Sequence, residues 1–289
     1  MKLANYVQDG QTHAGLISGS KLFPVKNQSG SVFGSVDEIL ASSSLDWVRK
    51  NEDQILRDGG IALDSVKLKS PVLKPEKIYC AAVNYMAHSK EQNTSPPTEP
   101  YFFTKFRNAL IGPEDDILLP KISKQVDWEA ELAVIIGKKG KDIPKEKAME
   151  YVAGYTVAND ISFRDLQKPG KSSYLGQNWV KGKGLDTAFP LGPLMVTTDE
   201  MKDPYSSELS LTVNGVTRQK SGINDMVFKI DSLIEFLSTD ITLVPGDVVS
   251  TGTPEGVAAF TGLPFLKDGD VVEASVRGIG TLRNRVRAQ

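Results

Sequence analysis

The chain has 289 residues, 40% of them hydrophobic, which is enough for a sizeable core. Its 34 basic and 36 acidic residues leave a formal net charge of -2, so neither nucleic acid nor an anionic membrane surface is expected as a partner. No apolar run approaches the roughly 20 residues that a membrane-spanning helix needs.

The start of the chain and its cysteine content predict a cytoplasmic protein. Residues 1–15 have neither the apolar core of a secretion signal nor the Arg-rich amphipathic character of an organelle-import signal. The only cysteine, Cys80, has no partner for an internal disulfide, and this fits a reducing compartment. We interpret Cys80 as a small core residue.

Residues 1–70 are predicted to form a small N-terminal α+β domain. Residues 3–25 alternate short apolar runs with polar turns, a pattern typical of strands joined by hairpins. Residues 35–58 have helical spacing, and either Ser35 or Asp37 could cap the helix.

The remainder, residues 71–289, is predicted to be a second, β-rich domain that follows a proline-containing linker at 71–75. Helical spacing is found only at 144–154 and 226–240. Because strands and helices do not alternate as βαβ units, we expect an α+β fold. Apolar or alternating runs between turn residues predict strands at 77–83, 131–137, 154–160, 193–198, 209–215 and 247–253.

Acidic residues gather in the segment 126–137, VDWEAELAVIIG. If this segment is one strand, Asp127, Glu129 and Glu131 share a face, because side chains alternate between faces. Asp160 ends another apolar run. One interpretation is a strand that emerges into solvent with hydrated acids; the other is a metal site.

The residue types favour a hard divalent cation over zinc. Glu129 and Glu131 would lie about 6–7 Å apart along a strand, so that one ion could contact both. With Asp160 they would form an oxygen-only site suited to Mg²⁺ or Mn²⁺. Zinc is disfavoured because His13 and His88 are the only histidines.

A His-Glu pair begins the polar segment 88–100, HSKEQNTSPPTEP. In a helical turn His88 and Glu91 would be neighbours, so the carboxylate could orient the imidazole as a general base for water. Such pairs are also common on ordinary surfaces. The segment itself has no periodicity, and we expect it to be a mobile lid.

Two further segments could bind substrate. Lys183 lies among glycines, and Thr253 lies in a Gly/Pro-bracketed turn that could hold a carboxylate, although both patterns are also typical of ordinary surface loops. Residues 169–173, PGKSS, are not a phosphate loop, because Asp165 stands where that motif needs its first glycine. Nucleotide cofactors are therefore not expected.

Five motifs, taken in order over roughly three-quarters of the chain, resemble the fumarylacetoacetate hydrolase family. They are NYxxHxxE at 84–91, DxExELAVIIG at 127–137, GYTVANDISxRDLQ at 154–167, GKxxDTxxPLGP at 182–193 and PGDxxxTGTPxGV at 245–257. The resemblance implies a mixed β-sandwich roll with a small N-terminal α+β domain, and a homodimer.

The resemblance also implies a role for individual residues. Glu129, Glu131 and Asp160 would ligate Mg²⁺ or Mn²⁺. His88 and Glu91 would be the water-activating dyad on the lid.

The same resemblance implies a set of substrate contacts. Lys183 would act on the substrate oxygens, with Arg164, Gln167 and Thr253 nearby. Tyr85, in the first motif, is also expected to contact the substrate.

The chain departs from the family pattern around the substrate. Gly184 and Leu185 stand where Ser and Phe are usual, Ala82 replaces a common glycine, and the segment 167–179 differs as well. We therefore expect the metal site to be kept and the substrate to be less predictable.

The expected substrate is a small 2-oxo acid that chelates the metal. We favour hydrolysis of a C–C bond in a 2,4-diketo acid such as an acylpyruvate, because both dyad residues are present. Decarboxylation of oxaloacetate, or isomerase or dehydratase chemistry on related keto acids, would use the same site. A catalytically silent binding protein is the least expected outcome, since all five ligand and dyad positions are kept.

Overall fold

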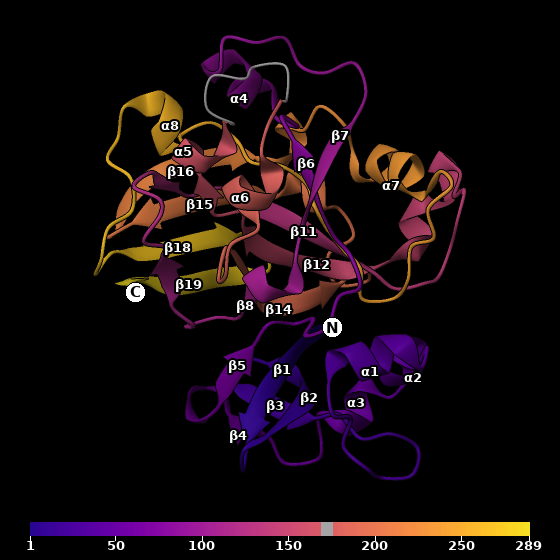
Figure 1. Ribbon diagram of the computed structural model, residues 1–289. Coiled ribbons are helices and arrows are strands. Elements are labelled where there is room, and N and C mark those ends of the chain that lie inside the picture. Colours follow the sequence, from indigo (N-terminus) through magenta and orange to yellow (C-terminus); the bar gives the residue numbers. More distant parts are fainter. Residues whose placement is uncertain (169–175) are drawn as a thin grey trace.

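The computed structural model describes residues 1–168 and 176–289 and is a β-rich α+β protein, as predicted (Figure 1). The segment 169–173, interpreted above as unlike a phosphate loop, lies outside the described residues, as does most of the divergent segment 167–179. Among the described residues, no helix is both long and apolar enough to cross a membrane.

The N-terminal elements form a distinct group at the bottom of Figure 1. The predicted helix at 35–58 is three short helices. Ser43, which has a left-handed backbone conformation with φ 56°, separates the first from the second, and Asn51 separates the second from the third. Ser35 is the cap, accepting a hydrogen bond from the Glu38 amide, whereas Asp37 accepts from the amides of Leu73 and Lys74. The elements are β1 (Lys2–Gln8), β2 (Gln11–Ser18), β3 (Lys21–Pro24), α1 (Val36–Ala41), α2 (Leu45–Lys50), α3 (Glu52–Ile55), β4 (Ile61–Ala62), η1 (Leu63–Ser65) and β5 (Lys67–Lys69).

One large sheet runs from these strands into the rest of the chain, in the order β4-β3-β2-β1-β14-β12-β11-β17-β6-β7, with β5 beside β1 and β8 beside β14. Leu3 of β1 pairs with Met195 of β14 at the junction. The division into domains at residue 70 stays a prediction. The further strands of this sheet are β6 (Ile78–Ala82), β7 (Tyr101–Lys105), β8 (Leu110–Ile111), β11 (Ala130–Ile136), β12 (Val152–Asn159), β14 (Phe189–Thr197) and β17 (Val248–Ser250).

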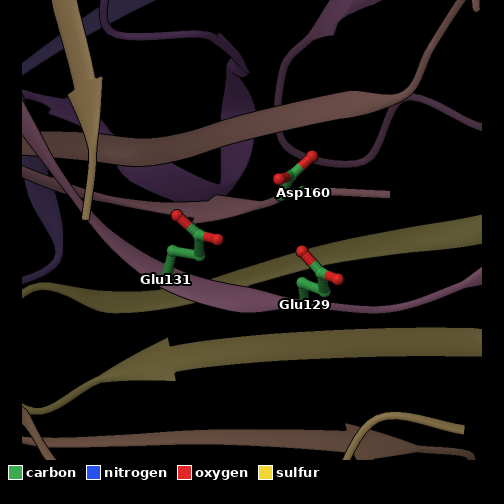
Figure 2. Close-up of side chains that lie close together, drawn as sticks. All are labelled: Glu129, Glu131 and Asp160. Carbon is green, nitrogen blue, oxygen red and sulfur yellow. The ribbon is translucent and has the colours of Figure 1, made fainter. Parts of the chain in front are cut away.

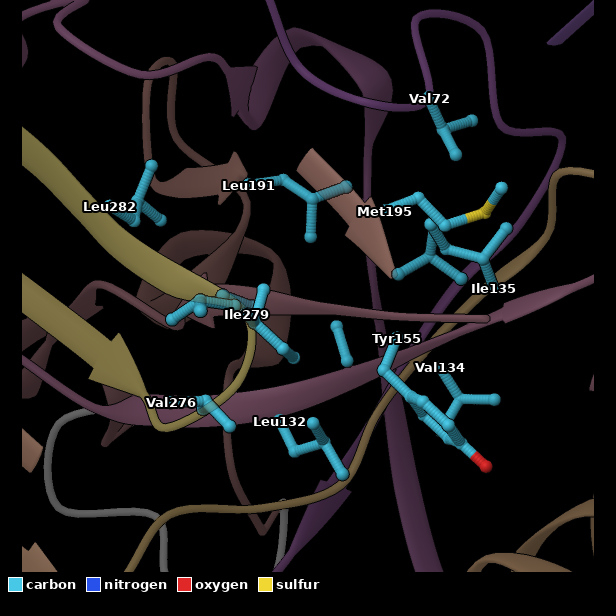
Figure 3. Packing of buried hydrophobic residues seen from close by; sticks show 14 of the residues in the cluster. Val72, Leu132, Val134, Ile135, Tyr155, Leu191, Met195, Val276, Ile279 and Leu282 are labelled. Atoms are coloured by element: carbon cyan, nitrogen blue, oxygen red, sulfur yellow. The ribbon is translucent and has the colours of Figure 1, made fainter. Parts of the chain in front are cut away.

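A second sheet packs on the first and closes the core, as expected for a sandwich. Figure 3 shows Leu132 of β11 near Val276 of β18, with Ile279 and Leu282 among the same apolar side chains. Every residue of β11 and β12 is buried, so these strands are covered on both faces. The second sheet is β9 (Ile117–Leu119), β15 (Glu208–Val213), β16 (Val216–Gly222), β18 (Val271–Val276) and β19 (Gly280–Ala288).

Of the two helices predicted in this part, one is confirmed as an α-helix and the other is a shorter 3-10 helix. α7 (Ile230–Ser238) buries Ile230, Leu233, Ile234 and Leu237, as its spacing predicts. Residues 145–151 instead form the 3-10 helix η3 (Lys145–Tyr151), in which only Ala148 is buried. One buried residue gives no apolar face to hold an α-helix, and the following residues join β12.

The remaining elements are short and most of them surround one end of β11 and β12. They are α4 (Met86–Glu91), η2 (Arg107–Ala109), β10 (Val126–Asp127), β13 (Ser162–Phe163), α5 (Arg164–Gln167), α6 (Trp179–Lys183), η5 (Pro204–Ser206), η6 (Ile223–Asp225) and α8 (Ala258–Thr261).

Candidate active site

Three buried carboxylates meet where β11 begins and β12 ends. The two strands are antiparallel neighbours with Glu131 opposite Ala158, so Glu129 and Glu131 lie beside Asp160, which follows β12. One carboxylate oxygen from each residue lies within 4.8 Å of the others, and all three residues are buried. Figure 2 shows Glu129 and Glu131 rising from one ribbon toward Asp160. The interpretation of a hydrated acidic face is therefore wrong.

The acidic segment is not one continuous strand, and this corrects the prediction for Asp127. β10 pairs with β13 and ends at Asp127, whereas β11 starts only at Ala130. The Asp127 carboxylate accepts hydrogen bonds from Arg164 Nε and from the amides of Ala258 and Ala259. Asp127 thus anchors Arg164 and the start of α8, and it lies outside the carboxylate triad.

Three buried or nearly buried cations face the triad. Lys183 Nζ lies 2.7 Å from Glu129 Oε2 and 2.8 Å from Asp160 Oδ2. Arg164 donates from a terminal nitrogen to Glu129 Oε1. Lys105 Nζ lies 2.7 Å from Asp160 Oδ1 while it donates to the carbonyls of Ile161 and Ala188. Sequence reasoning missed Lys105, whose one signal was a lysine inside the apolar run of residues 101–106.

None of the described residues is a cationic partner of Glu131. Its Oε2 accepts hydrogen bonds from Ser250 Oγ and from the Gly252 amide, 2.8 Å away. Gly252 has φ +93°, and an added Cβ would lie 2.9 Å from Asn84 Cβ, so a glycine is required to aim this amide at the carboxylate. Burial, together with the charges of Asp160 and Glu129, raises the pKa of Glu131 well above its ordinary value.

Glu129 shows the opposite behaviour. Burial raises the pKa of Glu129, but the Lys183 ammonium and the Arg164 guanidinium outweigh it and hold that pKa below its ordinary value. Four carboxylates thus face three cations, which leaves one negative charge uncompensated. The carboxylates are those of Asp127, Glu129, Glu131 and Asp160, and the cations are Arg164, Lys183 and Lys105. An all-oxygen triad within a cluster that carries one surplus negative charge suits a hard divalent cation such as Mg²⁺ or Mn²⁺.

The Glu131 carboxyl should make the metal-free protein less stable as pH rises. Its folded pKa lies above the unfolded value near 4.5, so the folded state holds more protons from pH 4.5 upward to the folded pKa. Glu129, whose pKa is lowered, changes the stability with pH only below about pH 4.5. Thermal unfolding in EDTA should therefore show a midpoint that falls from pH 5 toward pH 8, and Glu131→Gln should flatten this slope. An equal slope in the variant would contradict the assignment.

The predicted His-Glu pair is formed in α4. His88 Nδ1 lies 3.0 Å from Glu91 Oε2, and the Gly256 amide donates to Glu91 Oε1 at 2.9 Å. His88 is 4% exposed, and its ring meets Phe260 edge to face, with centroids 5.9 Å apart. The imidazole is therefore held in place by the carboxylate and by the loop that precedes α8.

One cavity brings most of the predicted site residues together. Tyr85, Glu91 and Asp160 are not part of its wall: Glu91 contacts His88 Nδ1, and Tyr85 is fully buried, with no hydrogen-bond partner for its hydroxyl among the described residues. The substrate role of Tyr85 stays a prediction. The predicted residues that line the cavity are His88, Glu129, Glu131, Arg164, Gln167, Lys183 and Thr253.

The outer wall of the cavity is aromatic, a feature that sequence reasoning did not identify. The Trp179 ring stacks on Phe103 with centroids 4.6 Å apart, and its indole Nε1 donates to the Tyr101 hydroxyl. Lys183 Nζ lies 4.9 Å from the centroid of the Phe103 ring. The charged centre is thus bordered by apolar rings, which strengthens electrostatic interactions inside it.

Amide hydrogen exchange would test the lid predicted at 88–100. α4 ends at Glu91 and no helix or strand follows until Tyr101, so the backbone of 92–100 has few internal hydrogen bonds. We expect its amides to exchange rapidly and to slow when Mg²⁺ and oxalate are added. Peptides from η3 serve as the control, and equal exchange in the lid with and without oxalate would contradict a moving lid.

Comparison with known proteins identifies the family. Residues 77–287 match the model described as fumarylacetoacetate (FAA) hydrolase C-terminal. The mitochondrial oxaloacetate tautomerase FAHD2A of Bos taurus is 47% identical over 222 residues, 76% of this chain and 69% of that protein.

Solved structures agree over the whole chain. A fumarylacetoacetate hydrolase from Exiguobacterium antarcticum is 33% identical with a TM-score of 0.85, and covers 100% of both chains. Maleylpyruvate hydrolase from Sphingobium sp. SYK-6, in complex with manganese (II) ion and pyruvate, is 30% identical with a TM-score of 0.82, covering 100% of this chain and 99% of that one. The fold and the resemblance expected from the motifs are confirmed, and the chain belongs to the fumarylacetoacetate hydrolase family.

Proposed function

We propose that the protein is a divalent-metal-dependent enzyme that interconverts the keto and enol forms of a 2-oxo dicarboxylic acid, with oxaloacetate as the expected substrate. The structural observation that carries this proposal is the shared cavity, whose wall contains His88 together with Glu129 and Glu131, two members of the carboxylate triad. The identity with a bovine protein named oxaloacetate tautomerase supports this choice among the reactions that the site could perform.

Glu129, Glu131 and Asp160 would hold the cation. When bound, Mg²⁺ or Mn²⁺ would supply a Lewis acid that stabilises negative charge on the oxygens of a 2-oxo acid. The manganese in the Sphingobium maleylpyruvate hydrolase complex supports this assignment.

The protein side chains would carry the proton. His88 takes a proton from C3 of the substrate: the C3–H bond breaks, its electron pair forms the C2–C3 double bond, and negative charge collects on the C2 oxygen. His88 then gives up the proton it has taken, and one proton, from His88 or from solvent, is added to that oxygen to complete the enol; the reverse sequence restores the ketone. The Glu91 carboxylate accepts a hydrogen bond from His88 Nδ1–H, which leaves Nε2 as the basic nitrogen of the ring. Lys183, already within 3 Å of two triad carboxylates, places positive charge beside the developing enolate.

Hydrolysis of a C–C bond in a 2,4-diketo acid is the second candidate. The His88–Glu91 pair could equally remove a proton from water, and the Sphingobium relative is named as a maleylpyruvate hydrolase. Decarboxylation of oxaloacetate needs no base and stays a third alternative. A homodimer and a cytoplasmic location also stay predictions, and the bovine relative is named as mitochondrial.

A parallel assay separates these reactions. Purified protein with Mg²⁺ or Mn²⁺ is given enol-oxaloacetate, and loss of the enol absorbance is followed together with pyruvate release; acylpyruvate cleavage is measured beside it. We expect rapid loss of the enol without pyruvate, abolished by EDTA. Faster acylpyruvate cleavage than enol loss would instead make the protein a hydrolase.

A further inference from the structure

The imidazole nitrogen that should act as the base is already occupied. Gln92, the residue that directly follows α4, places its carboxamide Nε2 2.6 Å from His88 Nε2. The opposite ring nitrogen, Nδ1, faces Glu91 Oε2 at 3.0 Å. Gln92 and His88 both line the cavity, so this contact lies on the substrate's side of the ring.

Hydrogen-bond chemistry fixes what this contact does. In neutral His88, Nδ1–H donates a hydrogen bond to Glu91, and the Nε2 lone pair accepts a hydrogen bond from the Gln92 amide. If the ring were protonated, Nε2 would instead donate to the Gln92 carbonyl. In either state Nε2 is unavailable to a substrate until Gln92 moves.

A substrate with a second carboxylate can cause that movement. An amide N–H bonds more strongly to a carboxylate than to a neutral acceptor such as the imidazole lone pair. Gln92 is only half-buried, and no other side-chain hydrogen bond holds its amide among the described residues. A substrate carboxylate attached to C3 would therefore attract the amide. Nε2 would then be free to take the proton from C3.

We infer that Gln92 is a positioning residue that shields the base of His88 and releases it to 2-oxo acids with a distal carboxylate. This inference rests on the proposed function and adds to it the residue that selects the substrate: through Gln92, 2-oxo dicarboxylates are accepted and their monocarboxylate counterparts are disfavoured. The selection acts through the base itself, because Gln92 touches the atom that takes the proton.

The kinetic test compares two substrates that differ only at the distal end. Exchange of C3 protons into D₂O, corrected for the rate without enzyme, is measured for oxaloacetate and for 2-oxobutyrate, which has a methyl group in place of the carboxylate. Gln92→Met keeps the size of the side chain and removes the amide. We expect kcat/KM for oxaloacetate to fall about tenfold or more and that for 2-oxobutyrate to rise about two- to tenfold, as expected for losing one charged and one neutral hydrogen bond.

A spectroscopic test reports on the contact without using activity. The chain has only two histidines, so ¹⁵N-labelled histidine gives a simple spectrum, and His13→Gln assigns it. In the Mg²⁺-loaded protein, Gln92→Met should move the His88 Nε2 resonance, whereas Gln177→Met, at another glutamine of the cavity wall, should leave it in place. Malate, which cannot enolise, should produce the same movement in the wild type, and 2-hydroxybutyrate, which lacks the second carboxylate, should not.

The two tests fail in different ways. If the wild type exchanges no C3 protons in any 2-oxo acid, the proposed function is wrong, and the response of the Nε2 resonance to malate still decides the role of Gln92. If exchange occurs but Gln92→Met changes both substrates in the same direction, or if the Nε2 resonance ignores both Gln92→Met and malate, Gln92 does not control the base.

Discussion

Glu131→Gln should abolish the metal-dependent activity while the protein stays folded. Glutamine has the size of glutamate but lacks the charge that a hard cation requires. A cation in such a site contributes several kcal/mol of transition-state stabilisation, so we expect the rate to fall by at least about 10³-fold. The fold should persist because Glu131 has no cationic partner in the described part of the chain that the substitution would leave unpaired.

Unfolding measurements test the metal assignment independently of activity. A ligand that binds only the folded state stabilises it by about 2.7 kcal/mol at a hundredfold excess over its Kd, so Mg²⁺ should raise the unfolding midpoint of the wild type. Glu131→Gln should lose this rise, while Glu150→Gln, at an exposed position on η3, should retain it. In EDTA the Glu131 variant should be at least as stable as the wild type at pH 8, because the buried Glu131 carboxyl, whose pKa is raised, costs the folded state stability above pH 4.5. An undiminished Mg²⁺ response in Glu131→Gln would show that the ion binds elsewhere.

The strands of the core could be predicted because their sequences determine them locally. The run at 131–137 is apolar at nearly every position after Glu131, as a strand covered on both faces must be, and β11 is buried throughout. The helix at 226–240 was equally clear, since its apolar residues recur at helical spacing. The prediction of an α-helix at 144–154 missed the 3-10 helix η3, because the spacing does not show that only Ala148 of that helix is buried.

The site was predicted in its members but not in its contacts. Motif spacing identified the triad and the dyad, whereas Lys105 reaches Asp160 from a strand 55 residues earlier, and no local pattern predicts that register. The break after Asp127 depends on pairing between β10 and β13, which likewise joins distant segments. Gln92 follows the dyad directly in sequence, yet its role appears only when its amide is seen on His88 Nε2.

His88→Ala should reduce enol–keto interconversion, and any C–C hydrolysis, by about 10²–10⁴-fold, the usual contribution of a general base. Both reactions need a proton to be removed, from C3 in one case and from water in the other. His88 contacts Glu91, Gln92 and Phe260, and none of these is a member of the carboxylate triad. Mg²⁺ should therefore raise the unfolding midpoint of His88→Ala as it does in the wild type.

Comparison with Glu131→Gln separates the base from the metal. Decarboxylation of oxaloacetate draws on the cation as an electron sink and needs no base, so His88→Ala should keep a larger fraction of any such activity than of tautomerisation. Glu131→Gln should lose both, since chelation is common to the two reactions. His13→Ala, in the N-terminal strand β2, is the matched histidine control and should keep full activity. If His88→Ala tautomerised oxaloacetate near the wild-type rate, another group would be the base, and the tautomerase mechanism proposed for this cavity would have to be abandoned.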